Sequence, residues 1–291
     1  MTLEEIRRLV IIAMFSDDVL FEKLVFKGGN ALELLYGIGA RSSLDLDFSI
    51  EQDFSDPDDI KRRMFSALRD RLESNALVMF DEQIERKFPK REPAVTLGYQ
   101  VTFKIIGKEH AENIGRMHSN DDRRIERMRI ESMVVGPAQQ RSFKIDISTD
   151  EFCSTKRQID LDDYAVCVYT LEMIAIEKLR AICQQMNEYS LRLHPAPRAR
   201  DFYDIHSIVS AIDMNFSEAE NVELLRNIFA AKRVPLSLLK KIPEYRDFHR
   251  PDWPAVVDSV AVRLNDFDYY YDFVIQIVQL LESLGIVDSP G

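Results

Sequence analysis

The sequence predicts an α+β protein, in which a mixed sheet with flanking helices is followed by a C-terminal helical bundle. Runs of alternating apolar and polar residues, typical of strands, are concentrated before residue 165, and helical periodicity dominates after it. A chain of 291 residues also exceeds the size that one hydrophobic core usually reaches. We therefore expect two domains, at residues 1–165 and 166–291.

The N-terminal part alternates helical and strand patterns. Helical periodicity occupies residues 2–15 and 57–74. Strand patterns occupy residues 44–50, 76–80, 94–106, 127–135 and 142–148. Gly28 and Gly29 precede a short helical pattern for which Asn30 can serve as the N-cap. Gly37 and Gly39 then end this helix, so that the chain can return as the strand at 44–50.

The C-terminal part predicts helices alone. Its helical patterns lie at residues 170–186, 198–212, 217–232 and about 254–285. Ser217 followed by Glu220 has the spacing of a capping box, and prolines mark the joins between the patterns. No repeat or low-complexity segment interrupts them, so a helical bundle is expected.

Composition limits the classes of function. The net charge of −11 argues against a protein that coats nucleic acid, so any RNA contact is confined to patches such as 192–200 or 123–129. Three cysteines without CxxC spacing predict reduced, buried thiols rather than a zinc site. The longest apolar runs are too short for a membrane span and no cleavable signal precedes them, so we expect a soluble cytoplasmic protein.

Three aspartates predict a cation site. Asp45 and Asp47 are two apart in a strand and therefore project from the same face, where their like charges repel. Asp146 is the acidic residue on the polar face of the strand pattern at 142–148. Carboxylate oxygens are the ligands that Mg²⁺ prefers, and a two-metal phosphoryl-transfer site needs such a set. The sequence thus predicts that Asp45, Asp47 and Asp146 bind Mg²⁺, most simply two ions.

Other residues are candidates for contact with phosphate. The turn at Gly28 and Gly29 enters a helix N-terminus, whose free N–H groups and positive dipole end suit phosphate. Lys178 lies at the edge of an apolar helical stripe and could neutralise triphosphate charge. A further cationic segment, a candidate contact for RNA or triphosphate, contains Arg192, His194, Arg198 and Arg200.

These residues carry a resemblance to a known family. The glycine turn, helix and Asp-x-Asp strand look like the signature of DNA polymerase beta-type nucleotidyltransferases, and the stretch is similar to the version in the AbiEii/AbiGii-type abortive-infection toxins. The first motif is represented here by Lys27, Gly28, Gly29, Asn30, Arg41, Ser43, Asp45, Asp47 and Phe48. Asn30 stands where the family usually has serine or threonine.

Three later motifs follow in order. They resemble "FKIDIS" with Lys144 and Asp146, "IAIEKLRAI" with Glu177, Lys178 and Arg180, and "RARDFYDI" with Arg200, Asp201, Tyr203 and Asp204. The resemblance implies a metal-dependent enzyme that moves an NMP from an NTP to an acceptor such as tRNA. It also implies a toxin of a toxin–antitoxin or phage-defence system, with an antitoxin as partner.

The resemblance also implies roles for individual residues. Catalysis falls to Asp45, Asp47, Asp146, Lys178 and Asp201. Nucleotide binding falls to Lys27, Gly28, Gly29, Asn30, Ser43, Lys144 and Arg200. The histidines, in contrast, have no acidic or cysteine partner at ligand spacing, and we interpret His194, His206 and His249 as surface or packing residues.

Alternatives remain open at the level of sequence. A metal-dependent glycosyltransferase also uses an Asp-x-Asp pair, but it needs a longer nucleotide-binding domain before the pair than this chain has before Asp45. A noncatalytic interaction protein that retains the fold would have little reason to keep three carboxylates. Within the same chemistry, a small molecule or a protein hydroxyl could replace RNA as the acceptor, and the acidic balance of the chain favours such an acceptor.

Overall fold

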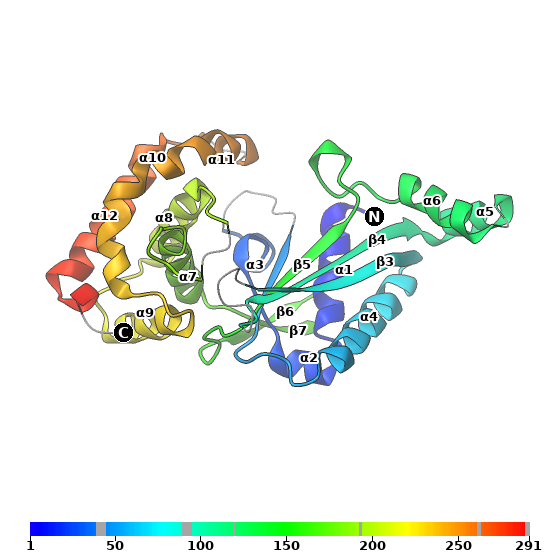
Figure 1. Cartoon of the computed structure of the whole chain (residues 1–291), viewed down its shortest axis with the longest axis horizontal. Coiled ribbons are helices and arrows are strands. Elements are labelled where there is room, and N and C mark those ends of the chain that lie inside the picture. Colours follow the sequence, from blue (N-terminus) through cyan, green and yellow to red (C-terminus); the bar gives the residue numbers. More distant parts are fainter. Residues whose placement is uncertain (39–44, 89–94, 119, 192–193, 261–262, 289–291) are drawn as a thin grey trace.

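A seven-stranded mixed sheet lies at the centre of the computed structural model, which describes residues 1–38, 45–88, 95–118, 120–191, 194–260 and 263–288 (Figure 1). The strands are β1 (Val25–Lys27), β2 (Leu46–Ser49), β3 (Leu77–Lys87), β4 (Gly98–Gly107), β5 (Phe143–Ser148), β6 (Arg157–Leu161) and β7 (Tyr164–Val168). Their order is β3-β4-β5-β2-β1-β7-β6, with parallel pairing of β2 with β5 and of β1 with β7. The predicted fold class is confirmed.

Helices from the first quarter of the chain pack against the sheet. They are α1 (Leu3–Met14), α2 (Asp18–Lys23), α3 (Gly28–Leu34) and α4 (Pro57–Glu73). Each of α1, α2 and α4 begins at a side-chain cap, because Thr2, Asp17 and Asp56 accept hydrogen bonds from N–H groups of the first turn. Helices α1 and α4 contact each other, and α4 also packs on β3. The helices expected at 2–15 and 57–74 are therefore present.

Two helices project beyond the far end of the β3–β4 hairpin, α5 (Lys108–Met117) and α6 (Asp121–Glu131) (Figure 1). The strand expected at 127–135 is wrong, because most of this segment belongs to α6. Asn120 caps α6 by accepting from the N–H of Arg123. Ile125 and Met128, three residues apart on one helical face, pack on a small satellite core with Phe80. Helical spacing of the buried residues, rather than alternation, decides the structure here.

The C-terminal part is helical, as expected. Its helices are α7 (Leu171–Cys183), α8 (Ala199–Ile212), α9 (Ala219–Ala231), α10 (Arg246–His249), α11 (Trp253–Ser259) and α12 (Phe267–Ser283). Short 3-10 segments are η2 (Leu236–Tyr245), η3 (Arg250–Asp252) and η4 (Ile286–Asp288), besides η1 (Pro137–Gln139) between α6 and β5. The segment at 254–285 is not one helix, because α12 begins anew at its cap, Asp266.

The capping box expected at Ser217 and Glu220 is wrong. Helix α9 begins at Ala219, with Glu218 as an N-cap residue that makes no side-chain capping bond. The Ser217 hydroxyl instead donates to the side-chain oxygen of Asn215, 2.7 Å away. A local hydrogen bond to the Asn215 side chain therefore replaces the capping bond expected of this hydroxyl.

The predicted domain boundary after residue 165 falls inside β7, which pairs with β1 in the sheet. One hydrophobic cluster contains buried residues from both sides of this boundary, from Ile6 to Val287. The three cysteines, Cys153, Cys167 and Cys183, are buried and free. No helix in the described ranges is both long and apolar enough to cross a membrane.

His249 is fully buried where η3 and α8 meet, and it predicts an acid-sensitive fold. Its Nδ1 accepts from the backbone N–H of Arg198 at 3.0 Å, and burial lowers its pKa to about 4. The unfolded chain, with a histidine pKa near 6.5, binds a proton that the folded chain excludes. Stability contributed by neutral His249 should thus be complete above about pH 6.5 and fall by roughly 1.4 kcal/mol per pH unit towards pH 4.

Urea unfolding between pH 7.5 and 5 measures this effect. His249→Asn should flatten the pH dependence, whereas the same change at the exposed His194 should leave the wild-type slope. A wild-type slope in the His249 variant would contradict the prediction.

Candidate functional site

A row of polar side chains crosses the sheet at one register. Lys27 of β1 pairs with Asp47 of β2, Asp47 pairs with Asp146 of β5, and Asp146 pairs with Gln100 of β4. Paired residues in adjacent strands place their side chains on the same face, so these four lie side by side. Asp47 and Asp146 are therefore neighbours although 99 positions separate them along the chain.

Gly28 allows the chain to pass close to Asp47. A Cβ atom at this position would lie 2.4 Å from Oδ2 of Asp47, and the glycine has a φ of +77°. Because of this short distance and this positive φ, any other residue at position 28 would force the carboxylate or the backbone to shift. Gly28 starts α3, so the first turn of this helix faces the aspartate.

Asn30 does not cap α3, contrary to the expectation from sequence. Helix α3 begins at Gly28 with Lys27 as N-cap residue, which places Asn30 inside the helix. Its buried side chain donates from Nδ2 to the backbone oxygen of Asp45 at 2.7 Å. Asn30 thereby fixes the residue that leads into β2. Ser43 and Arg41, also named from the sequence, lie outside the described residues.

A cavity of about 320 Å³ opens beside this row. It is lined by Lys27, Gly28, Gly29, Asp45, Asp47, Ser148, Glu177, Lys178, Arg198, Arg200 and Asp201. The structure thus brings together most of the residues predicted to form the site, from β1, α3, β2, α7 and the start of α8. Asn30, Lys144 and Asp146 do not line the cavity.

Asp146 is held by residues that the sequence did not single out. Its Oδ1 accepts from Nζ of Lys87 at 2.6 Å and from Nε2 of Gln100 at 3.0 Å. Lys87 reaches it across Gly98, its cross-strand partner in β4, which has no side chain to block the path. Recognising these partners requires the strand register, which no local pattern reveals.

Lys178 and Asp201 form a buried ion pair at the cavity wall. Nζ of Lys178 lies 3.0 Å from Oδ1 of Asp201 and 2.7 Å from Oδ2 of Asp204. Arg198 contacts the other oxygen of Asp201 at 3.0 Å. Burial would raise the pKa of Asp201, but Lys178 and Arg198 outweigh it and lower the pKa to about 2. Asp201 is therefore an anion that positions two cations at the cavity.

A second buried network lies behind Lys27. Glu151 contacts Arg180 at 2.7 Å and Lys27 at 3.2 Å, and Lys232 lies 3.8 Å away. Glu177 adds a second carboxylate to Lys27 and Arg180. Sequence analysis did not identify Glu151 or Lys232, because neither occurs in a recognisable pattern. This network connects the sheet with α7 and the end of α9.

Asp47 is the carboxylate whose ionisation the fold opposes. Burial raises its pKa to about 7, and Asp146, Glu177 and Asp45 contribute in the same direction, against the effect of Lys27. Burial likewise raises the pKa of Asp45. Asp45 and Asp47 thus have raised pKa values and lie near other acidic side chains. A bound cation would therefore stabilise their charged forms.

The donor chemistry of this set fits a hard divalent cation, since Asp45 and Asp47 present carboxylates to one cavity. In the described part of the chain, however, no group of three or more His, Cys, Asp or Glu side chains converges closely enough to hold a metal ion. Asp146 is turned towards Lys87 and Gln100, which explains why the third carboxylate does not join the pair.

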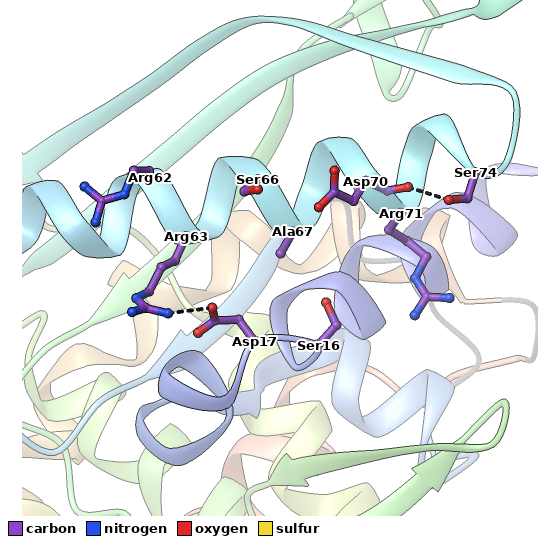
Figure 2. Close-up of a pocket in the computed structure, with 9 residues that line it drawn as sticks. All are labelled: Ser16, Asp17, Arg62, Arg63, Ser66, Ala67, Asp70, Arg71 and Ser74. Atoms are coloured by element: carbon purple, nitrogen blue, oxygen red, sulfur yellow. Dashed lines mark hydrogen bonds and ion pairs between the residues drawn. The ribbon is translucent and has the colours of Figure 1, made fainter.

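A larger cavity, of about 580 Å³, lies on α4 and does not contain the predicted residues (Figure 2). Ser16 and Asp17 face it from the α1–α2 junction, and the remaining lining residues belong to α4 and to its C-cap, Ser74. Its Arg63 donates to Asp17 at 2.9 Å. Because it lacks both the carboxylate pair and the glycine turn, the cavity at Asp47 is the candidate active site.

A mixed sheet that presents paired aspartates beside a glycine turn is the arrangement that the resemblance to nucleotidyltransferases predicts, and comparison with known proteins gives the class and the family. The family model "Nucleotidyl transferase AbiEii toxin, Type IV TA system" matches residues 10–273, and the chain belongs to this family. Membership identifies it as a nucleotidyltransferase of a type IV toxin–antitoxin system, which implies an antitoxin as partner.

Solved structures support the fold. A candidate nucleotidyltransferase from H. pylori is 18% identical, with 97% of this chain and 93% of that chain covered and a TM-score of 0.51. JHP933 from Helicobacter pylori is 17% identical, with 98% and 96% covered and a TM-score of 0.51. None of the curated protein sequences matches this chain. At these identities the structural likeness concerns the fold.

Proposed function

We propose that this protein transfers an NMP from an NTP to a hydroxyl of RNA, with tRNA as the acceptor class, at the cavity beside Asp47. The observation that carries the proposal is the pairing of Asp47 with Asp146 in adjacent strands, with Gly28 pressed against Asp47. This arrangement combines acidic groups with a close backbone approach, as phosphoryl transfer on a bound nucleotide requires.

In the proposed reaction the acceptor oxygen bonds to the α-phosphorus, the bond from that phosphorus to the β-phosphate oxygen breaks, and pyrophosphate leaves. Asp45 and Asp47 would hold Mg²⁺, with Asp146 as a third ligand once it is released from Lys87. Bound Mg²⁺ would supply charge neutralisation on the phosphates and lower the pKa of the acceptor hydroxyl. The hydroxyl proton would pass towards Asp146 and on to solvent.

The triphosphate would lie against the cationic wall of the cavity. Lys27, Lys178, Arg198 and Arg200 all line it, and the first turn of α3 adds backbone N–H groups at Gly28 and Gly29. Asp201 would orient Lys178 and Arg198 towards the phosphates, since it contacts both. Lys144, whose charge lowers the pKa of Asp45, would act from outside the cavity.

The net charge of −11 favours a second candidate acceptor, a small molecule or a protein hydroxyl, within the same chemistry. RNA must dock on limited cationic surface, such as Arg198 and Arg200 or the arginines of α6, and its binding should weaken steeply with salt. The proposal that RNA is the acceptor therefore predicts weaker acceptor binding at high salt, which the second candidate does not predict.

Incubation with each α-labelled NTP, Mg²⁺ and total cellular RNA tests the proposal. Label in RNA supports it, label in protein or in a small molecule favours the second candidate, and no label with any acceptor overturns catalysis. Asp47→Asn serves as the blank for all three, so that contaminating transferases are recognised.

Gly28→Ala should reduce NMP transfer by about 100-fold. The added methyl group would occupy the place of the Asp47 carboxylate, and displacing a reacting group by about 1 Å lowers a rate by this order. The positive φ should cost a further 1–2 kcal/mol of stability, on the order of what a left-handed L-residue costs. Initial rates and urea unfolding measure the two effects separately.

Gly37→Ala is the matched control. Gly37 also has a positive φ, of +63°, but an added Cβ would meet no described atom within 4 Å. This variant should lose stability to the same extent and keep its transfer rate. Equal losses of activity in the two variants would show that strain, and not the contact with Asp47, is responsible.

A further inference from the structure

A second cavity, of about 290 Å³, adjoins the candidate active site. The two cavities share Ser148 and Arg198, so the space beside Asp47 continues between the sheet and the C-terminal helices. Leu97, Gln184, Tyr189, Leu191 and Lys232 are among the remaining lining residues. We call this space the adjoining cavity.

The two cavities differ in charge. Asp45, Asp47, Glu177 and Asp201 line the candidate active site, whereas no described residue that lines the adjoining cavity is acidic. The cations that line it, Arg198 and Lys232, lie 3.0 Å from Asp201 and 3.8 Å from Glu151. Its other polar groups are those of serine, glutamine, tyrosine and histidine, and its apolar wall comes from Leu97, Leu191 and Ala196. Because both cations already have anionic partners, the apolar surface and the fixed polar groups suit a flat, neutral, hydrogen-bonding ligand.

The polar groups of the adjoining cavity are fixed by buried contacts. The hydroxyl of Tyr189, a residue that is 6% exposed, donates to the backbone oxygen of Lys232 at 3.0 Å. The same hydroxyl accepts from Nε2 of Gln184 at 3.2 Å. Within the described ranges no group donates to Oε1 of Gln184, which leaves this half-buried oxygen as an oriented acceptor for a ligand N–H.

We propose that the adjoining cavity binds the nucleoside of the donor NTP, a role that rests on the proposed function. The triphosphate lies in the candidate active site, Arg198 spans the junction, and the base packs between Leu97 and Leu191 with a ring N–H or amino group donating to Gln184. The cavity thereby selects among NTPs by the donors on the edge of the base.

Calorimetric titration of the full chain in Mg²⁺, without acceptor, tests this role. The probes are each of the four NTPs and inorganic tripolyphosphate, which lacks a nucleoside. Gln184→Met should weaken the preferred NTP about 10-fold, the value of one hydrogen bond, and leave tripolyphosphate unchanged. Tyr189→Phe, which releases the amide of Gln184, should reduce discrimination among the NTPs. Gln158→Met, at an exposed position of β6, is the control.

The other outcomes overturn the assignment. Unchanged NTP affinity in Gln184→Met, or an equal loss for tripolyphosphate, shows that the cavity does not bind the nucleoside. A raised KM for RNA with unchanged NTP affinity places the acceptor's terminal nucleoside there instead. If the wild-type chain binds no NTP, the proposed function itself is overturned. If the wild type and the Gln184 variant bind NTP equally well, only the nucleoside site is overturned.

Discussion

Asp47→Asn should lower the rate of NMP transfer by at least about 10³-fold while the chain remains folded. The substitution keeps the size of the side chain but removes the charge that would hold Mg²⁺, and metal ions contribute several kcal/mol to such transition states. Gel-based initial rates with the preferred labelled NTP measure the loss. Transfer within tenfold of the wild-type rate would remove Asp47 from the mechanism.

The stability of the variant separates this role from a structural one. Because the pKa of Asp47 is raised from 3.8 to about 7, the folded chain binds more protons than the unfolded chain between these two pH values, and the ionised form opposes folding at higher pH. Neutral asparagine relieves this cost, so the melting temperature of the metal-free variant at pH 8 should equal or exceed that of the wild type. Asp160→Asn, at an exposed position of β6, should change neither rate nor melting temperature.

Asp146→Asn should also abolish transfer, although Asp146 does not line the cavity. Its carboxylate now binds Lys87 and Gln100, and the proposed mechanism requires it to turn towards the acceptor. If the variant retains transfer, the reaction depends on the Asp45 and Asp47 pair alone.

Strand β5, which carries Asp146, could be predicted because it has one buried and one polar face, whereas β1, which carries Lys27, is buried throughout and was not predicted. In β5 the apolar Phe143, Ile145 and Ile147 are buried, and the intervening residues, Asp146 included, are more exposed. Alternation of this kind is a local property and can be read from the sequence. Helices α7, α8 and α9 were equally predictable, because their buried residues recur at helical spacing, whereas the single stretch expected at about 254–285 was wrong.

The contacts of the site could not be predicted in the same way. Lys87 meets Asp146 only because β3, β4 and β5 pair in a particular register, which depends on long-range packing. Asn30 has the residue type of an N-cap, but its amide is satisfied by the chain entering β2. In α6, charged residues between the apolar ones gave the sequence the alternation of a strand, but these charged residues face solvent. The packing of Ile125 and Met128 on the satellite core stabilises a helix instead. Tertiary contacts therefore override local preference at these positions.

Glu151→Gln should destabilise the folded chain by about 3–5 kcal/mol, the cost of breaking a buried ion pair from one side. Although burial alone would raise the pKa of Glu151, Arg180, Lys27 and Lys232 hold it well below its usual range. Glutamine keeps the shape of the side chain but removes its charge, so that Arg180, Lys27 and Lys232 face one another without this carboxylate. Lys232 offsets part of the cost, because its pKa is already lowered to about 8 by burial and it can lose its proton.

Urea unfolding at pH 7.5 measures the change, with Asp162→Asn as the matched control. Asp162 forms an exposed ion pair with Arg8 at 2.8 Å and has a positive φ that asparagine tolerates, so its loss should cost at most about 1 kcal/mol. A cost for Glu151→Gln as small as that of the control would mean that the buried cations find other partners. Because Lys27 adjoins Asp47 in the sheet, its loss of Glu151 should also change the transfer rate in the variant that remains folded.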